Sequence, residues 1–168
     1  MALTTLQAGF QETTYDHRVV DIRRVVRVMK GGRRFRFRAT VIVGNKRGAV
    51  GLGLAKGKDV QQAVAKAQEA AKKHLVRVLL FRGTVPHAIQ RRFRGAVVLI
   101  KPAPEGSGII AGGPIRSVAL LAGIHDLSSK MMGSHNPVNV IKATLLALSS
   151  MKSAPTRSKE SSSHVHAS

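Results

Sequence analysis

The sequence contains no cysteine and no tryptophan, and aromatic residues make up only 4% of its 168 residues. Without cysteine the chain can form neither disulfides nor cysteine-ligated zinc sites, and thiol catalysis is excluded. Acidic residues are also scarce: 8 Asp and Glu stand against 28 Lys and Arg, a formal net charge of +20. Such an excess opposes compact folding through self-repulsion unless a polyanion neutralises it. Nucleic acid is the polyanion that this composition favours, because neutralised phosphates release condensed counterions.

Long apolar runs and an N-terminal leader are also lacking. No apolar run approaches the roughly 18 residues of a membrane-spanning helix. The first 16 residues contain Glu12 and Asp16 but no Lys or Arg, unlike a secretory or transit peptide. An anionic membrane surface is the rival polyanion, but the basic residues fall on predicted strands rather than on a basic amphipathic helix. We therefore expect a cytoplasmic protein without membrane partners.

The positive charge is concentrated in one part of the chain. Between His17 and Lys101 lie 22 of the 28 basic residues and three acids, whereas six basic and three acidic residues follow from Pro102 onward. This asymmetry predicts a binding half and a half with a different use. The expected segments are an N-terminal extension (1–16), an RNA-binding domain (17–80), a second domain (84–151) and a disordered Ser/His-rich tail (152–168).

The sequence predicts a β-hairpin over residues 17–43, in which Gly31-Gly32 supplies the positive φ angles of a tight turn. Apolar residues occupy the even positions of its first strand except at Arg24, a break that favours a bulge or a frayed start. In the second strand the alternation is regular, and alternate side chains of a strand point to opposite faces. One exposed face therefore carries Arg34, Arg36 and Arg38.

We interpret the basic residues of this hairpin and of the nearby turns as one RNA-binding surface, rather than as a merely solvated strand face. Its expected members are Arg23, Arg24, Arg27, Lys30, Gly31, Gly32, Arg33, Arg34, Arg36, Arg38, Lys46, Arg47, Lys56 and Lys58. Gly51 and Gly53 are included as well. Two explanations of these two glycines remain open, because either RNA or a neighbouring helix could need a close approach to the strand.

A third strand over residues 49–55 and a helix after it complete a β-β-β-α unit. Asp59 and Gln62 have the spacing of a capping box at the start of the helix. Apolar residues, many of them alanine, then recur at helical spacing as far as Val78, which predicts a helix lying close against the sheet. Lys56 and Lys58 precede its N-terminus, where lysines and free backbone N–H groups can meet phosphates together.

The second half is predicted to form an α/β domain. Its expected elements are a hairpin with strands 85–90 and 96–100, a glycine-rich loop (105–113), a helix from Pro114 to the stop at Gly123, a strand (127–132) and a helix after Asn136-Pro137. Asn136 is expected to be the N-cap of the last helix.

An enzyme is not expected. The run from Gly51 to Lys58 suggests a nucleotide loop, but a Walker loop would need glycine at Leu52 and Ser or Thr at Asp59. Neither paired carboxylates nor magnesium ligands lie near the second glycine-rich loop. We therefore expect no cofactor, no metal and no small-molecule substrate. The alternative is a free-standing double-stranded-RNA-binding regulator, which would leave the apolar helix faces of the second half without a purpose.

Several motifs, in order from about residue 17 to residue 151, resemble the small-subunit ribosomal protein five family of bacteria. They are Lys30-Gly31-Gly32-Arg33 with its Phe-x-Phe strand, Val50-Gly51-x-Gly53, Ala70-Ala71-Lys72-Lys73, the loop 105–113 and the run 133–140. The resemblance implies an α+β fold: an N-terminal domain like a double-stranded-RNA-binding domain, then a C-terminal two-layer α/β domain. It also implies a left-handed βαβ crossover in the C-terminal domain, whereas such crossovers are usually right-handed.

The resemblance further implies a structural constituent of the small ribosomal subunit that acts in translation. The implied partners are 16S rRNA, small-subunit ribosomal proteins four and eight, and messenger RNA near the channel through which it enters. Support of subunit assembly and decoding accuracy is implied too. Gly108 and Arg116 fall in the region that the family uses against ribosomal protein four. By position, the resemblance also implies RNA contact at Ser134 and Asn136, although helix capping explains both side chains without RNA.

Overall fold

A computed structural model describes residues 14–152. Residues 153–168 of the expected tail and residues 1–13 of the expected extension lie outside this range. The first half contains β1 (Asp16–Met29), β2 (Gly32–Gly44), β3 (Ala49–Gly57), α1 (Val60–Lys73) and β4 (Leu75–Arg77). The second half contains β5 (Ile89–Phe93), β6 (Ala96–Pro102), β7 (Ile109–Ile110), α2 (Gly113–Ala122), β8 (Leu127–Gly133) and α3 (Pro137–Ser149).

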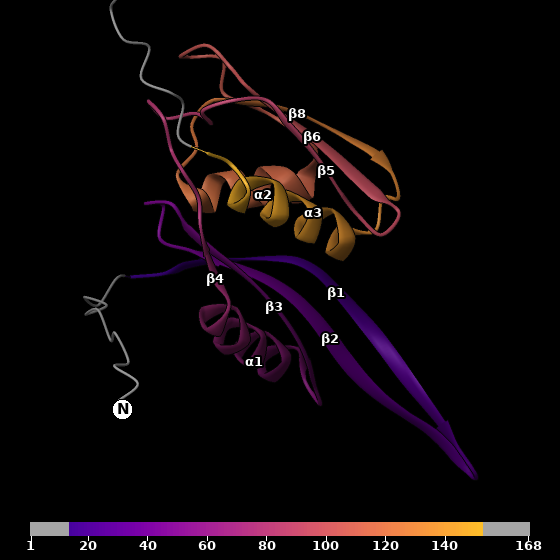
Figure 1. Cartoon of the computed structure of the whole chain (residues 1–168). Coiled ribbons are helices and arrows are strands. Elements are labelled where there is room, and N and C mark those ends of the chain that lie inside the picture. The colour runs from indigo at the N-terminus through magenta and orange to yellow at the C-terminus, as the bar shows by residue number, and fades with distance from the viewer. Residues whose placement is uncertain (1–13, 153–168) are drawn as a thin grey trace, which may run out of the picture.

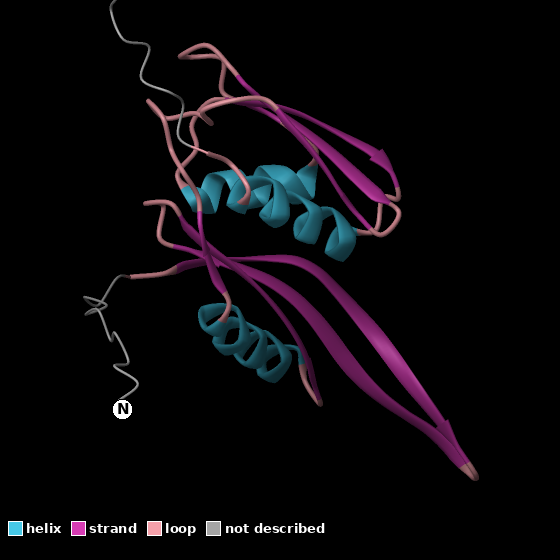
Figure 2. Ribbon diagram, viewed as in Figure 1, coloured by secondary structure: helices cyan, strands magenta, loops and turns pink. Residues whose placement is uncertain are grey.

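The elements stack in four layers, in the order α1, the sheet β1–β4, the helices α2 and α3, and the sheet β5–β8 (Figures 1 and 2). The α+β class expected from the sequence is confirmed. No helix between residues 14 and 152 has the length and apolar character needed to cross a membrane.

The first sheet has the strand order β1-β2-β3-β4, and all its neighbours are antiparallel. The expected irregularity of β1 lies between Val19 and Asp21 and not at Arg24. In the hairpin turn Gly31 has a positive φ of 85°, whereas Gly32 has an ordinary φ and pairs with Met29.

The prediction that the helix continues to Val78 was wrong, because α1 ends at Lys73. The next residues form β4, in which Val76 pairs with Val50. β-Branched and apolar residues fit a half-buried strand, so pairing with β3 decides their conformation.

The second sheet has the order β5-β6-β8-β7, and its strands β7 and β8 run parallel. Helix α2 connects these two strands and therefore forms the expected βαβ crossover, whose hand stays a prediction. The expected strand 85–90 is displaced toward the C-terminus, because β5 begins at Ile89 and the hairpin turn falls at Arg94-Gly95. Pro114 in the first turn of α2 and Gly123 as its αL cap are confirmed.

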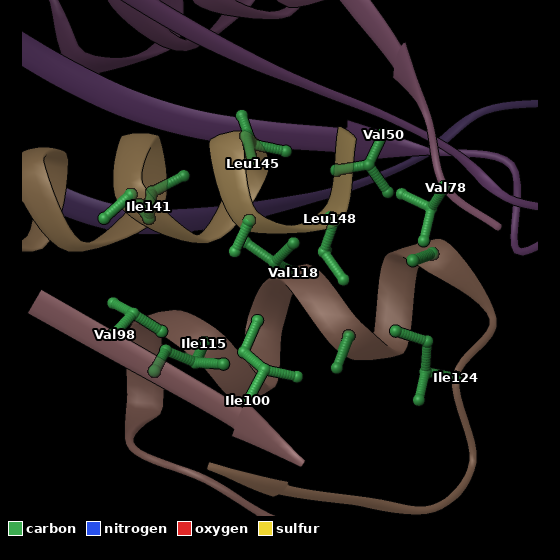
Figure 3. Packing of buried hydrophobic residues seen from close by; sticks show 14 of the residues in the cluster. Val50, Val78, Val98, Ile100, Ile115, Val118, Ile124, Ile141, Leu145 and Leu148 are labelled. Carbon is green, nitrogen blue, oxygen red and sulfur yellow. The ribbon is translucent and has the colours of Figure 1, made fainter. Parts of the chain in front are cut away.

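One continuous core joins the two halves. Ile42, Val50 and Val78 of the first half pack with side chains of α2, α3 and β6 (Figure 3). Backbone bonds reinforce this contact, since Lys46 N–H donates to Leu121 O at 2.9 Å and Gly48 N–H donates to Ala122 O at 2.9 Å. Helices α2 and α3 are thus covered by a sheet on each side, which explains why α3 buries seven residues around most of its circumference.

Candidate nucleic-acid interface

The β1–β2 hairpin extends beyond the rest of the first sheet (Figure 1). Strand β3 pairs with β2 from Phe37 to Gly44. The remaining residues 32–36 and their β1 partners 25–29 form a two-stranded ribbon. At about 3.3 Å per residue, this ribbon projects roughly 18 Å past β3. Both faces of the ribbon are therefore open.

Most of the predicted arginines share one face of this hairpin, which we call the arginine face. Cross-strand pairing aligns Arg27 with Arg34 and Arg23 with Arg38, and Arg38 is in turn paired with Lys56 of β3. The arginine face therefore contains Arg23, Arg27, Arg34, Arg36, Arg38 and Lys56. A row of three cations, Arg23, Arg38 and Lys56, runs across three strands.

The orientation of the arginine face follows from the same alternation. Thr40 and Ile42 point to the same face of β2 as Arg36 and Arg38, and both are buried. Ile42 belongs to the core shared with α2 and α3. The arginine face is thus the outer part of the surface on which the second half of the chain is seated.

The opposite face of the hairpin is largely apolar and also carries Arg24 and Arg33. Exposed Val26 and Phe35 are paired across the strands there, and Val28 is 74% exposed. The Arg24 guanidinium lies 3.7 Å from the centroid of the Phe35 ring, a cation–π contact. This contact explains why an arginine interrupts the apolar positions of β1.

Few carboxylates neutralise the hairpin. Residues 22–38 contain eight Lys and Arg and no acid. Among the residues that the structure describes, their single ion pair joins Arg23 Nε to Asp21 Oδ2 at 2.7 Å. The other guanidinium and ammonium groups of the hairpin are therefore available to an external anion.

Lys46 and Arg47 do not share this surface, so the expectation of one continuous patch was wrong. They occupy the turn at the other end of β2, about 33 Å from Arg36 along an extended strand. Lys46 Nζ contacts Asp16 Oδ2 at 2.6 Å, and this hydrogen bond and charge lower the pKa of the Asp16 carboxyl. Both basic side chains are exposed, and RNA contact at this distant turn stays a prediction.

Gly51 and Gly53 lie beneath α1 and not on the open surface. A Cβ at Gly53 would stand 1.8 Å from Ala67 O, and one at Gly51 would stand 2.3 Å from Ala71 O. Both residues are buried. The close approach of a helix therefore explains these glycines, and their assignment to the RNA-binding surface is corrected.

Lys56 and Lys58 are exposed before the N-terminus of α1, as the sequence predicts. Asp59 is the N-cap residue, but its side chain makes no capping bond. Gln62 Oε1 instead accepts a hydrogen bond from Lys58 N–H at 3.1 Å. The predicted capping box is therefore not formed, while the lysine side chains remain accessible.

Ser134 and Asn136 organise the start of α3. The Asn136 side chain accepts a hydrogen bond from Val138 N–H at 3.2 Å, and Ser134 Oγ accepts one from Asn136 N–H at 3.3 Å. Ser134 N–H also donates to Gly95 O at 2.8 Å, which joins this segment to the β5–β6 turn. Helix capping accounts for both side chains, and their contact with RNA stays a prediction.

Gly108 and Arg116 lie at a different surface, around β7 and the first turns of α2. Gly108 has a φ of +70° and donates its N–H to Asp126 Oδ1 at 2.8 Å. The Arg116 guanidinium donates to Ile109 O at 3.0 Å and is exposed. Nearby Ile110 and Leu120 are 61% and 42% exposed. An arginine among exposed apolar side chains is typical of a protein contact.

Sequence reasoning left a second basic cluster out of the expected site. It comprises Arg91, Arg92 and Arg94 around the β5–β6 turn, together with Lys142 of α3. Arg94 and Lys142 have their charged groups 5.8 and 5.4 Å from the Phe93 ring centroid. The run Arg-Arg-Phe-Arg was a visible signal, whereas Lys142 is brought in by the fold.

Between residues 14 and 152, no group of three His, Cys, Asp or Glu side chains is arranged to hold a metal ion. Asp126, one of the few acids of the second half, uses its carboxylate to fix the loop at Gly108.

Comparison with known families agrees with both halves of the architecture. Residues 15–79 match the N-terminal domain of ribosomal protein S5, and residues 91–161 match the C-terminal domain of ribosomal protein S5. Proteins built from these two domains form a structural, non-enzymatic family of ribosomal proteins. The chain belongs to the ribosomal protein S5 family. It is therefore a component of the small ribosomal subunit, a ribonucleoprotein particle that acts in translation.

Proposed function

We propose that this protein binds 16S rRNA through the arginine face of the β1–β2 hairpin and its tip, Lys30-Gly31. The observation that carries the proposal is the arginine face, which continues onto the projecting ribbon and has, within residues 14–152, one ion pair, between Arg23 and Asp21. Arginine presents a planar fork of donors that suits phosphate oxygens. A projecting ribbon lets these forks reach into folded RNA.

The mechanism is positioning rather than chemistry. Arginine forks and lysines hold phosphates across shaped RNA, largely without reading the base sequence. Lys30 and Gly31 at the turn have open space around the backbone, since no atom lies within 4 Å of a Cβ added at Gly31. The tip can therefore enter an RNA groove without moving any other part of the protein.

Protein neighbours are proposed for the second half. Exposed Ile110, Arg116 and Leu120 supply an apolar and cationic surface, which we assign to small-subunit ribosomal protein four. Contact with small-subunit ribosomal protein eight, a place near the channel for incoming messenger RNA, support of subunit assembly and effects on decoding accuracy follow from the family resemblance. A cytoplasmic location follows from the same resemblance.

The affinity for RNA is expected to fall steeply with salt. Each neutralised phosphate contributes about 0.7–0.9 to the log–log slope, so a surface of six to eight contacts predicts a slope of roughly −5 to −7. Binding of the full chain to transcribed 16S rRNA, followed from about 50 to 300 mM KCl, measures this slope. A slope near zero, or failure to co-sediment with small subunits, would refute the proposal.

Arg116→Gln is expected to weaken the complex with small-subunit ribosomal protein four by about fivefold or more, because buried interface arginines often contribute over 1 kcal/mol. The affinity for 16S rRNA should not change. Calorimetric titration of the purified partner measures the first quantity. Lys101→Gln, an exposed cation of β6, serves as the charge-matched control. Loss of RNA affinity with the protein complex intact would assign Arg116 to RNA instead.

A further inference from the structure

The cluster of Arg91, Arg92, Arg94 and Lys142 is held in a defined arrangement at one end of the second sheet. Arg91 Nε donates to Ser150 Oγ at 3.2 Å, and Arg92 Nε donates to Arg94 O at 2.8 Å. These bonds use the Nε–H of each guanidinium and leave the terminal nitrogens free to donate. Lys142 and Arg94 flank Phe93, which limits the directions that their charges can take.

No carboxylate is close to this cluster in the sequence. Residues 70–104 and 127–152 contain no Asp or Glu. Within the described range the ion pairs are those of Asp21 and Asp16, both in the first half. The three arginines and the lysine are exposed, and no carboxylate between residues 14 and 152 forms an ion pair with them.

The cluster and the β1–β2 hairpin lie toward the same side of the molecule. Strand β8 ends beside the β5–β6 turn, since Ser134 N–H bonds to Gly95 O. That end of the second sheet and the tip of the β1–β2 hairpin lie toward the same side in Figure 1. The second half packs on the face of the first sheet that also carries the arginines, because Thr40 and Ile42 of that face are buried. The arginine face is thus turned toward the half of the chain that carries the cluster.

We propose that Arg91, Arg92, Arg94 and Lys142 form a second phosphate-binding surface, so that one folded RNA segment is held by both this cluster and the arginine face. This inference rests on the proposed function and extends it, because the cluster adds contacts from the second half of the chain. Two separated rows of cations can fix the orientation of an RNA segment, whereas a single ribbon leaves it free to rotate.

An acidic protein surface is a less suitable partner for this cluster. Protein interfaces are rich in apolar and aromatic contacts at their centre, but Phe93 is half-buried and its ring is flanked by cations. Three guanidinium groups within four residues fit the repeated negative charge of a phosphate backbone more closely.

The test uses the full chain with Arg91, Arg92 and Arg94 replaced by glutamine. Its charge-matched control is Lys66/Lys72/Lys73→Gln on α1, which we call the α1 control variant; these lysines are exposed on the far side of the first sheet. The cluster variant should lower the salt slope for transcribed 16S rRNA by about 2–3 and weaken binding tenfold or more at low salt. The α1 control variant should change the slope by less than about 1.

Further outcomes separate this inference from the proposed function. An unchanged slope in the cluster variant, with loss of slope on mutation of the hairpin arginines, would overturn the second surface and leave the hairpin intact. Unchanged RNA affinity with weaker incorporation into small subunits would assign the cluster to an acidic protein and also overturn it. A variant in which Arg91, Arg92 and Arg94 are replaced by lysine keeps the charge and should retain most of the salt slope for 16S rRNA. If the lysine variant lost as much of the salt slope as the glutamine variant, the arginines would act through their hydrogen bonds to Ser150 and to the β5–β6 turn, and not through their charge.

Discussion

Replacement of Gly53 by alanine is expected to lower the free energy of unfolding by about 3 kcal/mol or more, because overpacking of a closed interior usually costs 1–3 kcal/mol. The added Cβ would stand 1.8 Å from Ala67 O and 2.7 Å from Ala71 N, so the backbone of α1 itself must move. A backbone cannot rotate away as a flexible side chain can. For a chain of this size the melting temperature should fall by roughly 6–12 °C.

Gly32→Ala is the matched control for this prediction. Gly32 also lies in a strand of the same sheet, but no atom lies within 4 Å of a Cβ added there. The free energy of unfolding of this variant should lie within about 0.5 kcal/mol of that of the parent protein. Urea titration of both variants by circular dichroism measures the difference. Equal stability of the two variants would mean that α1 does not rest on β3 in solution.

Replacement of Arg34, Arg36 and Arg38 by glutamine is expected to produce the largest loss of RNA affinity. The three side chains lie on the arginine face, and none of them forms an ion pair within the described residues. Loss of three phosphate contacts should reduce the log–log salt slope for 16S rRNA by about 2–3. The weakening should be uniform over RNA sequences, because phosphate contacts carry no base information.

Thermal stability provides the necessary check on this variant. Arg34 and Arg36 are exposed and Arg38 is half-buried. The free energy of unfolding should therefore change by no more than about 1 kcal/mol. The α1 control variant removes the same charge from another surface and should keep most of the slope. An equal effect of the two variants would show that net charge, and not the arginine face, drives binding. Unfolding of the hairpin variant would assign the arginines a structural role.

The local parts of the fold could be predicted from the sequence because they depend on neighbouring residues. Alternation in β2 places Arg34 and Arg36 on one face, and Asn136 caps α3 through its own side chain. Gly123 ends α2 in the left-handed conformation. Each of these features follows from a pattern of a few residues, so no tertiary contact was needed to predict it.

The remaining features depend on contacts between distant segments. Thr40 continues the alternation of the exposed arginines, yet it is 1% exposed because the second half covers that part of the sheet. Gly51 and Gly53 fit two explanations until α1 is placed above them. Leu75–Arg77 have helical spacing and become a strand because β3 offers an edge. Lys142 lies over the Phe93 ring because α3 packs on β5.

The core shared by the two halves also argues against a free-standing RNA-binding regulator formed by the first half. Removal of the second half would expose Ile42 and Val50, which are fully buried in the intact chain. It would also break the backbone bonds from Lys46 and Gly48 to the end of α2. The first half alone would thus present an apolar sheet face to solvent, a surface prone to association.

The placement of α3 between the two sheets also has a consequence for synthesis of the chain. The first sheet is complete once Arg77 has been made, but α2 and α3, the helices that cover its second face, are both complete only at Ser149. At 5–20 residues per second, those intervening residues take roughly 4–14 s to translate. A nascent chain therefore holds an uncovered, strongly cationic sheet for several seconds, a period in which early capture by RNA or a chaperone would protect it from aggregation.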